Sequence, residues 1–145
     1  DDSDRFWLDA ENDVYLTEED ISQLAQAKAA NVAGLHLLHQ NYGIDFPDLD
    51  VFYLAGGFAR HIDIDHARRI GLIPDLPDER IVQVGNAALE GATLALLSVS
   101  AREETDQLVR RIEHVELETF PEFFHCFTDG AQFVPFQNRI TEAII

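Results

Sequence analysis

An apolar run at residues 51–54 is followed, after one alanine, by a pair of glycines, and this junction constrains the fold more than any other feature of the chain. Such a short, continuous apolar run is typical of a strand buried on both faces, as in parallel sheets covered by helices. Gly56 and Gly57 permit a sharp turn and leave no side chain to keep a ligand away. We therefore expect an α/β fold with an internal strand at residues 50–55. The turn is either a ligand-contacting loop, which includes Phe58, or an ordinary strand-to-helix connection.

Capping and turn residues divide the rest of the chain into further elements. A hairpin is expected over residues 5–16, followed by a helix that Thr17 caps and that Gly43 ends. The small side chains inside this helix permit the close approach of a neighbouring backbone or of a ligand. The other expected elements are a helix capped by Asp63 and closed by Gly71, a strand at residues 81–84, a helix from residue 85 to about 98, a helix to about 113 with a capping box of Ser100 and Glu103, a strand at residues 115–117, and a helix opened by Thr119 and Glu122 and ended by Gly130. This alternation predicts one domain with a layered α/β sheet.

The charge balance argues against two classes of partner. The chain of 145 residues has 27 Asp and Glu against 10 Lys and Arg, a net charge of −17, which repels phosphate backbones and anionic lipids. We therefore expect neither nucleic acid nor a membrane as a partner. The longest apolar stretch, residues 92–99, is far shorter than the roughly 20 residues that cross a bilayer. A single cysteine, Cys126, which we expect to be a small buried hydrophobe, fits a reducing cytoplasm.

Five sequence blocks, taken together, point to a family. They are TEEDI at residues 17–21, AKAA at 27–30, LAGGF at 54–58, RIGLIPDLP at 69–77 and VGNAA at 84–88. In this order and spacing the chain resembles, over residues 14–127, the C-terminal domain of reductive activators of corrinoid proteins. The resemblance implies an actin-like ATPase half-domain of the ASKHA type, RNase H-like, with a mixed sheet and flanking helices. Residues 1–145 would then form a single domain, the C-terminal nucleotide-binding part of a longer protein.

The resemblance also implies cofactors and partners. The full-length protein would bind ATP or ADP with Mg²⁺, and an N-terminal [2Fe–2S] ferredoxin domain would pass an electron to the Co(II) corrinoid of a methyltransferase system. The partner would be a corrinoid protein or corrinoid methyltransferase, and a homodimer is possible. This chain has no Asp-Gly phosphate loop at the expected upstream position and no four-cysteine spacing. We therefore expect the chain to be catalytically silent by itself.

Two residues of the long helix are candidates for the nucleotide site. Lys28, the only lysine, is seven residues from both Ile21 and Leu35 and so lies on the apolar stripe of the helix. Its ammonium either reaches a ribose or phosphate oxygen or extends to a nearby carboxylate while its stem packs on apolar surface. The resemblance implies that Lys28 and Asn31 line an adenosine pocket.

The remaining candidates follow the two expected strands. Arg60 offers a planar guanidinium that can stack on adenine, although the family more often has Gly and Asn at positions 59 and 60. An exposed surface arginine is the alternative. Gly85 and Asn86 open a helix whose amides can meet an anion, while Asn86 can instead serve as the N-cap.

Other chemistries receive less support. His61, Asp63 and Asp65 would share one face of an extended chain, as zinc or iron ligands do, but Asp63 as a helix cap is the favoured interpretation. We identify neither catalytic nor metal-binding residues. Two rival functions stay open: an actin-fold kinase or dehydratase-activator ATPase, and a non-catalytic acidic module that docks a basic partner.

Overall fold

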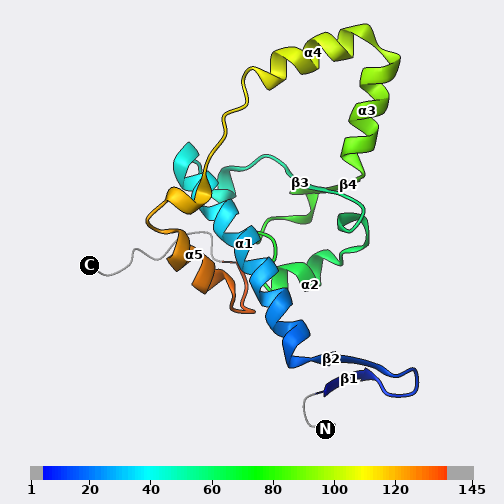
Figure 1. Ribbon diagram of the computed structural model, residues 1–145, viewed down its shortest axis with the longest axis vertical. Helices are drawn as coiled ribbons and strands as arrows, with labels where there is room; N and C mark the ends of the chain where they lie inside the picture. Colours follow the sequence, from blue (N-terminus) through cyan, green and yellow to red (C-terminus); the bar gives the residue numbers. More distant parts are fainter. Residues whose placement is uncertain (1–4, 137–145) are drawn as a thin grey trace.

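The structure is a computed structural model, and it describes residues 5–136. Its strands are β1 (Arg5–Asp9), β2 (Val14–Thr17), β3 (Phe52–Ala55) and β4 (Ile81–Gly85). Its α-helices are α1 (Glu18–Tyr42), α2 (Ile64–Arg69), α3 (Ala87–Leu97), α4 (Val99–Val109) and α5 (Phe123–Gly130). Short 3₁₀ turns are η2 (Phe46–Asp48), η3 (Ala59–His61), η4 (Asp78–Arg80) and η5 (Leu117–Thr119). The long helix α1 runs through the middle of the molecule, with the β1–β2 hairpin at one end (Figure 1).

Helix α1 begins and ends where the sequence predicts. The Thr17 hydroxyl accepts a hydrogen bond from the Asp20 amide at 3.1 Å, and the Asp20 carboxylate accepts one from the Thr17 amide at 2.9 Å. This reciprocal capping box satisfies two amides that the first turn would otherwise leave open. Gly43 ends the helix in the left-handed conformation, with φ +69°, and its amide donates to the carbonyls of His39 and Gln40.

The small residues of α1 allow α5 to pack unusually close. A Cβ placed at Gly130 would lie 3.1 Å from both the Cα and the carbonyl oxygen of Ala29 and 3.1 Å from Cβ of Val32. Only a glycine fits this contact without displacement of a neighbour. Of the two expectations for the alanine-rich face, a neighbouring backbone is therefore what the structure places there.

Two buried clusters lie along this helix pair. One contains Val32, Phe46 and Phe136, and the other contains Ala33, Leu37 and Cys126. Phenylalanines of the α5 segment and Leu117 pack on the second cluster. Burial raises the pKa of the Cys126 thiol, which is 3% exposed and behaves as the small hydrophobe expected from the sequence.

The strands form two separate two-stranded sheets among residues 5–136. β1 and β2 are antiparallel, whereas β3 and β4 are parallel and are connected by the crossover that contains η3, α2 and η4. In the parallel pair Phe52 is opposite Ile81, and the register shifts at the carboxyl ends, where Ala55 pairs with Gly85. This α/β arrangement agrees with the fold class inferred from the sequence.

Four local predictions are wrong. The strand before Gly56 is not an internal, buried one: within residues 5–136, β3 pairs with β4 alone, and none of its four residues is buried. Residues 115–117 form no strand; Leu117 begins η5 instead, and its Cδ1 would lie 3.4 Å from a Cβ at Gly34, so packing on α1 takes the place of strand pairing. Helix α4 is capped by Ser98 rather than Ser100, because α3 and α4 meet at Ser98 with no loop between them. Helix α5 has no side-chain cap, and Glu122 occupies its N-cap position in place of the expected Thr119.

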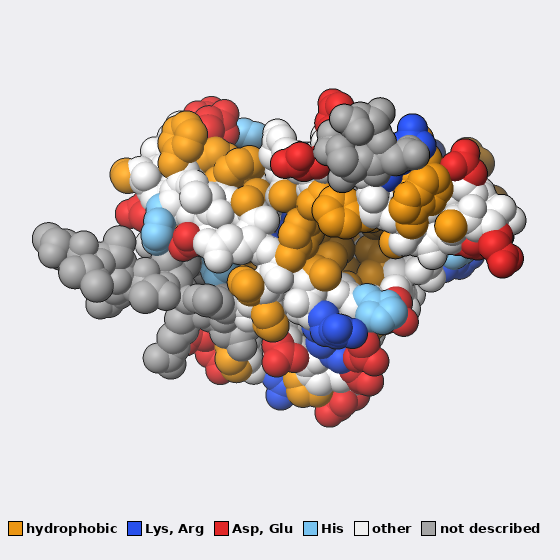
Figure 2. Space-filling view, turned by 90° about the horizontal axis from the view of Figure 1, so that it is seen from below, with side chains coloured by type: hydrophobic (Ala, Val, Ile, Leu, Met, Phe, Trp, Pro, Cys, Tyr) orange, Lys and Arg blue, Asp and Glu red, His pale blue; other side chains and the backbone are white. Residues whose placement is uncertain are grey.

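The helices α3 and α4 extend from β4 away from the rest of the molecule (Figure 1), and neither contains a buried residue. We call residues 86–112 the α3–α4 arm, and α1, α5 and the segments that pack on them the body. At the opposite end, Figure 2 shows apolar side chains around a hollow beside the β1–β2 hairpin, with acidic side chains toward the edges of the face. Within residues 5–136, no helix combines the length and apolarity needed to cross a membrane.

Candidate functional site

Two glycines bring the carboxyl ends of β3 and β4 together. The Gly56 amide donates a hydrogen bond to the Gly85 carbonyl at 2.5 Å, and both residues have positive φ, +112° and +61°. Residues other than glycine rarely adopt this backbone conformation. A Cβ at Gly56 or Gly57 would contact nothing within 4 Å, so the turn faces open space rather than packed protein. The geometry is that of a ligand-accessible edge at the carboxyl ends of parallel strands.

Arg60 lies across this edge. A Cβ at Gly85 would be 3.1 Å from one terminal guanidinium nitrogen of Arg60, 3.3 Å from Nε and 3.4 Å from Cζ. These similar distances place the guanidinium beside Gly85, and a Cβ at position 85 would have to displace it by a few tenths of an ångström. Arg60 is itself exposed, and a planar guanidinium is a group that can stack on an aromatic ring.

Gln83, which the sequence analysis missed, holds Arg60 in place. Its side-chain amide donates to the carbonyl of Ala59 at 2.7 Å and to that of Ile62 at 2.9 Å, and so ties the η3 turn to β4. A polar residue at an alternate position of a predicted strand was the available signal, but nothing in the sequence shows that the crossover returns to it.

Phe58 and Asn86 flank the same edge. The Phe58 side chain is 79% exposed, which is unusual for a large aromatic residue and leaves it accessible to a ligand. The Asn86 side chain accepts a hydrogen bond from the Leu89 amide at 3.0 Å, which confirms its predicted role as the N-cap of α3. The edge therefore brings together Gly56, Gly57, Phe58, Arg60, Gly85 and Asn86 from two parts of the chain 30 residues apart.

Lys28 and Asn31 make their polar contacts elsewhere. Lys28 is 3% exposed, and its Nζ donates to the Gly130 carbonyl at 2.6 Å and to the Gln132 carbonyl at 2.8 Å. Burial lowers the pKa of this ammonium. Asn31 donates from Nδ2 to the Leu72 carbonyl at 3.0 Å. Both side chains therefore fasten later segments of the chain to α1, and Lys28 would have to break these bonds to reach a nucleotide.

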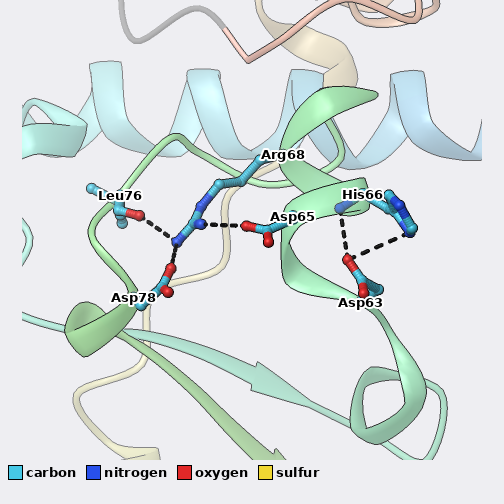
Figure 3. A network of polar contacts seen from close by, with 6 residues as sticks. All are labelled: Asp63, Asp65, His66, Arg68, Leu76 and Asp78. Atoms are coloured by element: carbon cyan, nitrogen blue, oxygen red, sulfur yellow. Dashed lines mark hydrogen bonds and ion pairs between the residues drawn. The ribbon is translucent and has the colours of Figure 1, made fainter.

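A second polar network fixes the segment before β4 (Figure 3). The Arg68 guanidinium donates to the Asp65 carboxylate at 3.1 Å, to the Leu76 carbonyl at 2.7 Å and to the Asp78 carboxylate. The hydrogen bond to Asp78 is the main reason that the pKa of Arg68 is raised. Sequence reasoning missed this network, because the i,i+3 pair with Asp65 is visible in the sequence but the contact with Asp78 depends on the path of the loop.

The His61–His66 segment is organised as a helix start. The Asp63 carboxylate accepts a hydrogen bond from the His66 amide at 2.9 Å, which confirms Asp63 as the cap of α2, and it lies 3.5 Å from the His66 ring (Figure 3). In the part of the chain that the structure describes, no three His, Cys, Asp or Glu side chains are grouped as metal ligands would be.

Comparison with known proteins decides the family. Residues 4–143 match the family described as the C-terminal domain of RACo, the ASKHA domain. The chain belongs to this family. It is 36% identical over 121 residues to the corrinoid activation enzyme RamQ of Eubacterium limosum, an alignment that covers 83% of this chain and 20% of the relative. It is 30% identical over 118 residues to the [Co(II) methylated amine-specific corrinoid protein] reductase of Methanosarcina barkeri, with 78% and 22% covered.

These matches confirm the resemblance drawn from the five sequence blocks and the actin-like, ASKHA-type fold class. This ASKHA domain spans only about a fifth of the length of the curated relatives it matches. The relatives are named for the activation or reduction of corrinoid proteins as whole proteins.

Proposed function

We propose that this chain is the C-terminal nucleotide-binding domain of an ATP-dependent reductive activator, which delivers an electron to the Co(II) corrinoid of a methyltransferase system. The observation that carries the proposal is the open edge formed by Gly56, Gly57 and Gly85 with the guanidinium of Arg60 across it. Membership of the family and the functions for which the two relatives are named support the same conclusion. A corrinoid protein or corrinoid methyltransferase is the proposed partner, and the cytoplasm is the proposed compartment.

The edge fits the nucleoside part of ATP or ADP. An adenine ring that stacks on the outer face of Arg60 would gain a cation–π contact, and the glycine turn allows the ribose to approach the backbone closely. The exposed Phe58 ring offers further apolar surface to the base. Bound ATP would supply free energy through hydrolysis of its phosphoanhydride bond. The residues of this chain would recognise and orient the nucleoside.

The phosphate groups and the iron–sulfur cluster fit this chain less well. Its net charge of −17 disfavours a polyphosphate unless Mg²⁺ accompanies it. Its one cysteine is buried and cannot hold a [2Fe–2S] cluster. We therefore assign nucleoside recognition to this chain and derive no hydrolysis or electron-transfer step within it.

Titration of ADP with Mg²⁺ into the chain, followed by calorimetry and by amide NMR, tests the proposal. We expect saturable binding that shifts the Gly56 and Gly57 amides, and an increase in Kd of about fivefold in Arg60→Ala, since loss of one stacking contact is worth about 1 kcal/mol. Arg102→Ala, which removes an arginine from α4, should bind as the wild type does. Shifts confined to other amides, or equal Kd values for the two variants, would contradict the proposal.

A further inference from the structure

Arg60 belongs to a short element that has little internal support. The element is η3, a 3₁₀ turn of three residues whose N-cap residue makes no side-chain hydrogen bond. A backbone hydrogen bond from the His61 amide to the Phe58 carbonyl, at 3.0 Å, closes the turn. Hydrogen bonds in 3₁₀ turns have poorer geometry than those in α-helices. A guanidinium that must meet the plane of a ligand therefore needs support from outside its own turn.

The side chain of Gln83 supplies that support from β4. Its Nε2 donates to the Ala59 carbonyl at 2.7 Å and to the Ile62 carbonyl at 2.9 Å, one residue before and two residues after Arg60. The nitrogen of a side-chain amide carries two hydrogens, so these two bonds use both of them. One side chain thus holds both ends of the turn that carries the guanidinium.

Strand β4 has an extra residue at this point. Two consecutive residues of β3 are opposite Gln83 and Gly85, so the residue of β4 between them has no counterpart. Such a bulge redirects the side chains beside it, and bulges are frequent next to functional sites. Here both neighbours of the extra residue face η3: Gln83 bonds to its carbonyls, and a Cβ at Gly85 would lie 3.1 Å from the Arg60 guanidinium.

These hydrogen bonds restrict the turn more than they stabilise the fold. Gln83 itself is exposed, so water can replace its bonds to the turn at little cost in global stability. Without them, η3 and the long side chain of Arg60 have more conformations available, and a ligand that stacks on the guanidinium must select one of them. The cost of that ordering is subtracted from the binding free energy.

We propose that Gln83 is a positioning residue for the nucleoside site: by fixing η3 at both ends, it holds the Arg60 guanidinium where a base can stack on it. The inference rests on the proposed function, because it takes the glycine edge as the place where the nucleoside binds. Gln83 contacts the turn and not the nucleotide, so its whole effect on affinity passes through Arg60.

Calorimetry with Mg²⁺ and ADP on the full chain tests the role of Gln83. Gln83→Met keeps the length of the side chain, adds no charge and removes both donors, and we expect it to raise Kd about threefold. Arg60→Ala/Gln83→Met should bind ADP as weakly as Arg60→Ala alone, because no guanidinium is then left to position. Gln107→Met, the same substitution at an exposed position of α4, should bind as the wild type does.

Amide exchange in the nucleotide-free chain, measured by NMR, tests the turn itself. Protection of the His61 amide, which closes η3, should fall in Gln83→Met and persist in Arg60→Ala, while the amides of α1 stay as protected as in the wild type. Unchanged His61 protection in Gln83→Met, an unchanged Kd, or an equal rise in Kd with and without Arg60 would overturn the role of Gln83 and leave nucleotide binding intact. A wild-type chain that does not bind ADP would instead overturn the proposed function, and the role of Gln83 with it.

Discussion

The body and the α3–α4 arm both contain a helix rich in alanine and leucine, but that of the body is covered by other segments and that of the arm is exposed. Helix α1 has an alanine-rich face, and α5 packs on it so closely that Gly130 leaves no room for a Cβ. Helix α3 is richer still in alanine and leucine, yet none of its residues is buried. The comparison shows that an apolar helical pattern predicts that a face will be covered but does not identify what covers it.

The hydrogen bonds and ring contacts of side chains also differ between the body and the arm. In the body, Lys28 donates two hydrogen bonds to the carbonyls of Gly130, the last residue of α5, and Gln132. The His36 ring contacts Phe46 edge-on and stacks on Phe136 with 4.6 Å between ring centroids. In the arm, the side chains of Asn86, Thr93 and Ser98 make local hydrogen bonds, to backbone atoms at most four residues away. The body is therefore fastened by contacts between distant segments, and the arm by its own helical turns.

Alanine substitutions at two glycines, one in contact with the body and one in the arm, give the largest expected difference in stability. At Gly71, where φ is +71°, a Cβ would lie 2.0 Å from the Val134 carbonyl oxygen, so Gly71→Ala must displace the chain that follows α5. We expect a loss of about 4 kcal/mol in the free energy of unfolding, from backbone strain and overpacking together. At Gly91, in α3, a Cβ would contact nothing within 4 Å, and Gly91→Ala should instead stabilise the helix by up to about 1 kcal/mol. Urea denaturation measures the loss in Gly71→Ala, and hydrogen exchange in α3 measures the gain in Gly91→Ala; a loss of stability in both variants would contradict the contrast between body and arm.

Acid should loosen the body through His36. Burial, and then the charge of His39, lower the pKa of His36 to about 4 from an ordinary value of 6.5. The unfolded chain therefore takes up this proton first as the pH falls from 6.5 to about 4, and stability decreases over that window by about 3 kcal/mol. His36→Phe, which keeps an aromatic ring against Phe46 and Phe136, should remove this part of the pH dependence. Denaturant midpoints measured from pH 7 to pH 4 for both proteins would decide, and parallel curves would exclude His36 as the cause.

Local signals in the sequence predicted much of the fold. The caps at Thr17, Asp63 and Asn86 and the stop at Gly43 were all correct, because each depends on residues within four positions of one another. The strand at residues 115–117 was wrong because its apolar residues pack on α1 instead of pairing with another strand. Burial on a helix and pairing in a sheet demand the same residue types, so the sequence could not separate them.

The candidate site also has parts that local sequence signals predict and parts that they do not. The glycine edge with Arg60 follows from residues close to two strand ends, and the parallel register brings those ends together. Lys28 was placed on the apolar stripe of α1 correctly, but its carbonyl partners lie 102 and 104 residues away. Contacts at such separations depend on the path of the whole chain. Gln83 and Arg68 were missed for the same reason.

Lys28→Met tests whether the body depends on its buried ammonium. Methionine fills a similar volume but leaves the Gly130 and Gln132 carbonyls without this donor, and we expect the free energy of unfolding to fall by about 2 kcal/mol. Hydrogen exchange should rise in α5 and leave α3 unchanged, since the lost bonds connect α1 only to the α5 end of the chain. Arg102→Met, which removes an exposed cation from the arm, should leave stability within about 0.5 kcal/mol of wild type. A loss of ADP binding with no loss of stability would instead support a nucleotide contact for Lys28.

Removal of two helix caps gives the smallest expected difference in stability between body and arm. It also tests most directly whether the arm unfolds independently of the body. The Thr17 hydroxyl caps α1 and the Ser98 hydroxyl caps α4, each by accepting one backbone hydrogen bond, at 3.1 and 3.2 Å. Either substitution by alanine removes about 1 kcal/mol of helix stability. Because α1 carries the core, Thr17→Ala should lower the free energy of global unfolding by that amount. Because α4 contributes no buried residue, Ser98→Ala should speed hydrogen exchange in α4 and leave global unfolding unchanged. If Ser98→Ala lowers global stability as much as Thr17→Ala does, the arm folds as one cooperative unit with the body and the division drawn here is wrong.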